Sequence, residues 1–184
     1  MTSAYDPIPV TILAIDPGRT SGWAVFAFDR CIASGTATTH DQRVLAIEIA
    51  QAEESRSGRK LIVVAEKWAP GGRWYTATMT GIGAAWGMWQ AALESCGVPA
   101  ARIVRVYPST WRHTVIGGGG RSIKGSEWAL RAAKRAETET GHPCSDDEAE
   151  AVCIGAWALR ADAVRDKAPS RRRKPVTPRY GPPH

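Results

Sequence analysis

Short apolar runs separated by polar turns dominate the N-terminal part of the chain. Three such runs follow one another through the turns DPGRTSG and DR, a pattern that predicts an antiparallel meander of strands. The later run KLIVVAE is apolar almost throughout, which is typical of a strand buried on both faces of a sheet. The predicted strands cover residues 10–16, 22–28, 31–38, 60–66 and 102–107.

Other segments have the character of helices. Val44, Leu45, Ile47 and Ile49 recur at near-helical spacing, and a Ser-Gly pair ends this pattern. The predicted helices cover residues 41–57, 77–95, 122–139 and 145–165. Strands and helices in this order predict an α/β fold: a mixed five-stranded sheet, with a three-stranded antiparallel meander and further parallel strands, flanked by helices.

The charge of the chain is concentrated at its C-terminal end. The 184 residues carry a formal net charge of +6, and residues 166–184 account for five of these charges. We expect one domain over residues 1–165 and a disordered, Pro-rich tail over 166–184, because the tail has too few apolar residues to bury. Such a tail attracts polyanions, chiefly nucleic acid, although a solubilising end without a specific partner fits equally well. Its cationic cluster is Arg171, Arg172, Arg173 and Lys174.

Two classes of protein are disfavoured by the composition. No apolar stretch approaches the roughly 18 residues of a membrane helix, so we expect a soluble, cytoplasmic protein without a membrane partner. The four cysteines form no CxxC pair and have no companion histidine at metal spacing, so neither a disulfide framework nor a zinc site is predicted. His113 and His142 are isolated in the sequence and are interpreted as ordinary surface or core residues.

Carboxylates stand at both strand ends where the pattern changes from apolar to polar. Asp16 ends the first predicted strand and Glu66 ends the fourth. If these strands are parallel neighbours, both side chains emerge at the same sheet edge, where α/β proteins bind their ligands.

The last predicted helix adds further acids. Ser145 and Glu148 fit a capping box, which leaves Asp147 and Glu150 on one helix face, where they repel unless a cation lies between them. Asp146 replaces Asp147 if the helix begins one residue earlier. Acids in a first helical turn are common in any case, because they favour the helix dipole. Four carboxylates suit Mg²⁺ or Mn²⁺, and two such ions activate a water and stabilise the leaving oxygen of a phosphodiester.

Four segments together carry a resemblance to a known family. ILAIDPGRTSGWAVF, LIVVAEKW, RVYPSTWR and SDDEAEAVCIGAWAL occur in this order, and the sequence resembles the RuvC-like Holliday junction resolvases of the RNase H-like superfamily, in their bacteriophage form. The resemblance covers residues 11–165. It implies a homodimer that nicks opposing strands of a four-way DNA junction, in a bacterial or phage-infected cell. It also implies two Mg²⁺ or Mn²⁺ ions per active site, held by the catalytic residues Asp16, Glu66, Asp147 and Glu150.

DNA contacts are predicted outside the acids. Relatives carry an aromatic residue shortly after the second acid, and Trp68 is favoured over Trp74 and Tyr75 for this role at the junction centre. The glycine-rich loop before residue 125 carries Arg121 and Lys124, which fit phosphate contacts as well as a solvated helix start. This loop is no Walker A motif, because Ser126 stands where the lysine is required.

Other functions remain open at this level. A flap, branched-DNA or single-strand nuclease of the same superfamily would use the same acids. A non-catalytic DNA-binding protein of this fold is disfavoured, because all four acids are present. A small sugar-kinase or actin-like ATPase module is disfavoured, since its second phosphate-binding hairpin is not visible here and the chain is too short for the two domains that such proteins need.

Overall fold

The computed structural model describes residues 10–67, 76–117, 125–161 and 164. Its strands are β1 (Val10–Asp16), β2 (Ser21–Ala27), β3 (Arg30–Ala37), β4 (Lys60–Glu66) and β5 (Ile103–Val106). Its helices are α1 (His40–Ser57), α2 (Thr76–Ser95), the 3-10 helix η1 (Ala100–Arg102), α3 (Pro108–Val115), α4 (Gly125–Thr140) and α5 (Asp146–Ala158). All five strands form one sheet in the order β3-β2-β1-β4-β5.

The sheet is mixed, as the sequence predicts. β1, β2 and β3 pair antiparallel, whereas β4 pairs parallel with β1 on one side and with β5 on the other. The β2–β3 turn places Phe28 and Asp29 at φ 52° and 64°. Positive φ at both central residues is the geometry of a tight hairpin turn that matches the twist of its strands. The predicted fold class is therefore confirmed.

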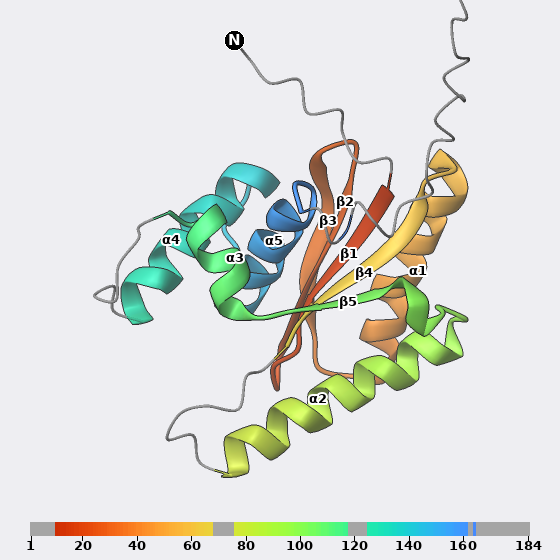
Figure 1. Ribbon diagram of the computed structural model, residues 1–184, viewed down its shortest axis with the longest axis horizontal. Helices are drawn as coiled ribbons and strands as arrows, with labels where there is room; N and C mark the ends of the chain where they lie inside the picture. The colour runs from red at the N-terminus through yellow and green to blue at the C-terminus, as the bar shows by residue number, and fades with distance from the viewer. Residues whose placement is uncertain (1–9, 68–75, 118–124, 162–163, 165–184) are drawn as a thin grey trace, which may run out of the picture.

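Helices cover both faces of this sheet (Figure 1). α3, α4 and α5 lie on one face, and α1 and α2 lie on the other. Alternate residues of β1 point to opposite faces of the sheet: Ile12 packs toward α5, and Leu13 packs toward α1 and α2. Both faces of the central strands are thus buried, which explains their continuous apolar runs.

Helix α5 packs unusually close to β2. A Cβ atom at Gly155 would overlap the ring of Phe26, and one at Gly22 would overlap the backbone carbonyl of Asp147. Only glycine allows these two backbones to approach so closely. The start of α5 is therefore fixed against β2, close to the end of β1.

Two element predictions need correction. α3 was not predicted, although Pro108 directly after a strand is a signal for the first turn of a helix. The last helix is shorter than predicted, because α5 ends at Ala158. None of the helices in the described part of the chain combines the length and the apolar character that a membrane span requires.

Candidate metal centre

The strand ends bring the first two acids together. Ile15 of β1 is the register partner of Ala65 of β4 in the parallel pair. Asp16 and Glu66 are the next residues of their strands, so both carboxylates emerge at the same edge. The condition set by the sequence pattern, that the two strands be parallel neighbours, is met.

The first turns of α5 supply the other two acids. Ser145 is the N-cap, and its hydroxyl accepts a hydrogen bond of 3.3 Å from the backbone N–H of Glu148. The second half of the predicted capping box is replaced by a tertiary contact: the Glu148 carboxylate accepts a hydrogen bond of 2.7 Å from the Ser34 hydroxyl of β3. Glu148 is thereby directed to β3, while Asp147 and Glu150 face the strand ends.

Three of the four predicted acids form one cluster. Asp16, Glu66 and Glu150 each place a carboxylate oxygen within 4.8 Å of the others. Asp147 lies close enough to this group for its charge to raise the pKa of Asp16. Asp146, the alternative to Asp147, is exposed. The structure thus brings Asp16, Glu66 and Glu150 together, with Asp147 nearby, and leaves Asp146 exposed.

The cluster holds more negative charge than its surroundings balance. Burial raises the pKa of Asp16 well above its ordinary value, and the charges of Glu150, Glu66 and Asp147 raise it further. Burial also raises the pKa of Glu66 to about 7, against the opposing effect of Arg112. A bound cation would remove both the repulsion and much of the burial penalty. The donor set therefore fits a hard divalent ion.

Helix α3 contributes two contacts that the sequence analysis missed. The indole N–H of Trp111 donates a 2.9 Å hydrogen bond to Oε2 of Glu66, and Nη2 of Arg112 lies 2.8 Å from Oε2 of Glu150. Arg105 of β5 donates a 2.8 Å hydrogen bond to the backbone carbonyl of Glu66. These contacts orient the two glutamates. Trp111 and Arg112 belong to the segment RVYPSTWR, whose helical signal at Pro108 could have placed them near the site.

Known structures share this architecture. The chain matches no protein-family model and no curated protein. It is similar to a structure of Thermus thermophilus RuvC in complex with a Holliday junction substrate, with 22% identity, a TM-score of 0.54, and coverage of 86% of this chain and 98% of that chain. The chain has a RuvC-like fold. A second Thermus thermophilus RuvC structure gives 20% identity and a TM-score of 0.54 at the same coverage.

In this RuvC-like fold, the predicted DNA contacts lie outside the described residues. They are Trp68, Arg121, Lys124, Arg171, Arg172, Arg173 and Lys174. The structure therefore describes the carboxylate cluster and the residues that orient it, but not the predicted DNA contacts. His113, predicted to be an ordinary residue, is exposed, and its ring meets that of Trp128 edge-on at 5.7 Å.

Replacing Trp111 by phenylalanine is expected to weaken Mn²⁺ binding at the cluster by about tenfold or more. The substitution keeps an aromatic ring in the core but removes the hydrogen bond that orients Glu66, and such supporting contacts contribute about 10- to 100-fold to metal affinity. Calorimetric titration with Mn²⁺ measures the change.

Trp89→Phe is the matched control for this substitution. Trp89 is as deeply buried but packs on the opposite face of the sheet, and its indole nitrogen has no hydrogen-bond partner among the described residues. Its removal should leave Mn²⁺ affinity unchanged. Equal losses in the two variants would show that ring packing, and not the Glu66 contact, matters.

Proposed function

We propose that this protein is a metal-dependent, structure-selective DNA endonuclease that resolves four-way junctions by paired nicking. The observation that carries the proposal is the convergence of Asp16, Glu66 and Glu150, with Asp147 beside them, at one sheet edge of a RuvC-like fold. One of the structural neighbours is RuvC bound to a Holliday junction substrate. The carboxylate cluster supplies the chemistry that a fold alone does not imply.

The four acids are proposed to hold two Mg²⁺ or Mn²⁺ ions. All their donor atoms are carboxylate oxygens, the ligands that hard divalent ions prefer. When bound, such a pair of ions supplies an activated water and stabilises the leaving oxygen of a phosphodiester. The rigid strand ends keep Asp16 and Glu66 in place for this task.

Other residues of the chain prepare the site. Trp111 orients Glu66, and the guanidinium of Arg112 balances the charge of Glu150 at 2.8 Å. Arg112 is 32% exposed, so it is open to solvent at the edge of the cluster, where a phosphate would approach. We assign it a positioning role toward Glu150.

DNA binding is proposed to involve the remaining cationic and aromatic residues. Trp68 would act at the junction centre, and Arg121 and Lys124 would contact phosphates. The tail over 166–184, with Arg171 to Lys174, would follow the domain over 1–165 and add affinity through counterion release. Paired nicks on opposing strands need two active sites, so we propose a homodimer of the bacteriophage type that acts in the cytoplasm of a host cell.

Cleavage of branched DNA tests the proposal directly. A labelled four-way junction is incubated with the full-length protein beside linear duplex, flap and single-stranded DNA, with Mg²⁺, Mn²⁺ or EDTA. We expect symmetric paired nicks in the junction with either metal and none with EDTA.

Two other outcomes would contradict the proposed junction cleavage and favour a different function. Metal-dependent cutting of flaps or single strands, with the junction left intact, would keep the metal centre and assign another substrate. Binding of the junction without cutting of any substrate would identify a non-catalytic DNA-binding protein.

A further inference from the structure

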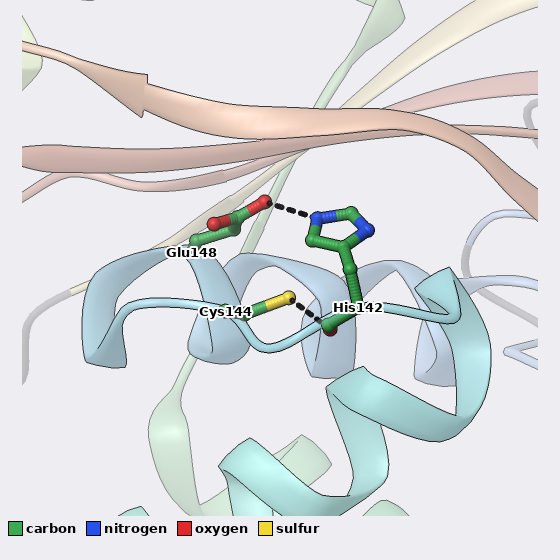
Figure 2. A group of neighbouring side chains, drawn as sticks. All are labelled: His142, Cys144 and Glu148. Atoms are coloured by element: carbon green, nitrogen blue, oxygen red, sulfur yellow. Dashed lines mark hydrogen bonds and ion pairs between the residues drawn. The ribbon is translucent and has the colours of Figure 1, made fainter.

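A second group of potential metal ligands lies at the turn between α4 and α5 (Figure 2). One ligand atom from each of His142, Cys144 and Glu148 lies within 4.8 Å of the other two. The Nε2 atom of His142 is 3.5 Å from Oε1 of Glu148. The sequence analysis treated His142 as isolated and predicted no zinc site. His142 is isolated in the sequence, but the fold places its ring beside the carboxylate of Glu148.

The spacing suits a single tetrahedral ion. Bonds of about 2.1 Å from zinc to nitrogen and oxygen place those two ligand atoms about 3.4 Å apart in a tetrahedron. The observed 3.5 Å between His142 and Glu148 matches this edge. Cys144 lies on the same side of the turn, with Sγ 3.6 Å from the backbone carbonyl of His142 (Figure 2). Because His142 is 55% exposed, its ring has room to adjust around an ion.

The donor set distinguishes zinc from the ions proposed for the carboxylate cluster. A thiolate, an imidazole and a carboxylate together are typical ligands of Zn²⁺, whereas Mg²⁺ takes oxygen ligands alone. Ionised Cys144 and Glu148 would balance the two positive charges of the ion. Three protein ligands leave one tetrahedral position for water.

Neighbouring side chains support two of the three ligands. The Ser34 hydroxyl of β3 hydrogen-bonds to Oε1 of Glu148 at 2.7 Å. The Thr140 hydroxyl at the end of α4 lies 3.5 Å from Sγ of Cys144. Contacts of this kind orient ligands and tune their metal affinity. The Glu148 side chain is only 12% exposed, so its position is already fixed before an ion binds.

We propose that His142, Cys144 and Glu148 bind a zinc ion that joins the α4–α5 turn to the first turn of α5. The site is distinct from the carboxylate cluster: Glu148 contacts Ser34 of β3, whereas its neighbours in sequence, Asp147 and Glu150, face the strand ends. An ion there orders the start of the helix that carries both acids. The proposal does not depend on nuclease activity.

Cobalt titration of the full-length protein tests this site. Co²⁺ replaces Zn²⁺ in such sites, and a Co²⁺-thiolate bond gives a charge-transfer absorption in the near ultraviolet. Excess Mg²⁺ is added to occupy the carboxylate cluster. We expect the absorption to saturate at one Co²⁺ per chain and to disappear when Zn²⁺ is added.

Variants assign the ligands. Cys144→Ser should abolish the thiolate absorption, whereas Cys96→Ser, a partly buried cysteine that packs on the other face of the sheet, should retain it. His142→Gln and Ser34→Ala should each weaken Zn²⁺ binding by about tenfold or more in a chelator competition. Far-ultraviolet circular dichroism verifies that each variant is folded.

Three results would overturn the zinc site: no thiolate absorption with Co²⁺, an absorption that persists in Cys144→Ser, or unchanged Zn²⁺ affinity in His142→Gln. The cluster would then be an ion pair and a packed thiol at a helix start. None of these measurements uses DNA, so failure here leaves the proposed nuclease untouched. Failure of junction cleavage likewise leaves the zinc site in place.

Discussion

Replacing Asp16 by asparagine is expected to lower metal-dependent junction cleavage by about 10³-fold or more. The carboxylate of Asp16 lies within 4.8 Å of those of Glu66 and Glu150, and its pKa responds to the charges of both and of Asp147. Asparagine keeps the shape and one oxygen acceptor but removes the charge that would hold a cation. Single-turnover cleavage of a labelled junction in Mg²⁺ measures the loss.

Asp146→Asn provides the matched control. Asp146 is exposed in the first turn of α5, directly beside Asp147, and its loss should change the rate only slightly. Junction binding should survive in Asp16→Asn, because affinity for DNA rests mainly on phosphate contacts. Wild-type cleavage by Asp16→Asn would mean that the carboxylate cluster is not the active site.

The strand-end acids could be predicted because their positions follow from simple rules. The apolar run that ends at Asp16 and the run that ends at Glu66 identify two buried strands, and parallel neighbours expose their carboxyl ends at one edge. Asp147 and Glu150 share a face by helical periodicity alone. Local pattern and sheet topology together therefore sufficed to place these acids near one another.

Residues that act through tertiary contacts could not be found in this way. Trp111 reaches Glu66 across 45 positions of the chain, and Ser34 reaches Glu148 across 114. No local pattern specifies such a pair. Glu148 shows the difficulty most clearly, since its spacing from Ser145 indicated a capping box, while the folded protein directs its carboxylate to β3 and His142.

The buried charge of Glu66 lowers the stability of the metal-free protein, and Glu66→Gln removes that charge. In EDTA at about pH 8, we expect this variant to be more stable than the wild type. Burial raises the pKa of Glu66 from an ordinary value of 4.5 to about 7. A raised pKa means that the folded state holds the proton more tightly, so this contribution to stability is present at low pH and is lost as the pH rises through 7.

The size of the effect follows from that shift. A rise from 4.5 to about 7 corresponds to about 3 kcal/mol of unfolding free energy lost by about pH 8. Glutamine does not ionise, so the variant does not lose this stability, and its side-chain oxygen still accepts a hydrogen bond from the indole N–H of Trp111. The difference between variant and wild type should therefore be small near pH 4.5 and grow toward pH 8. Urea unfolding in EDTA across this range measures it.

Adding Mg²⁺ and testing a surface variant distinguish the stability effect of Glu66→Gln from the general effect of removing a negative charge. Excess Mg²⁺ should stabilise the wild type at about pH 8 and stabilise Glu66→Gln less, because the cation offsets the cost of burying the Glu66 charge, which glutamine does not carry. Glu48→Gln, on the exposed face of α1, should change stability by no more than about 0.5 kcal/mol.

A Glu66→Gln protein that is less stable than the wild type in EDTA at about pH 8 would show that the Glu66 charge is already balanced by Arg112. The charge of Glu66 would then not favour metal binding at the cluster.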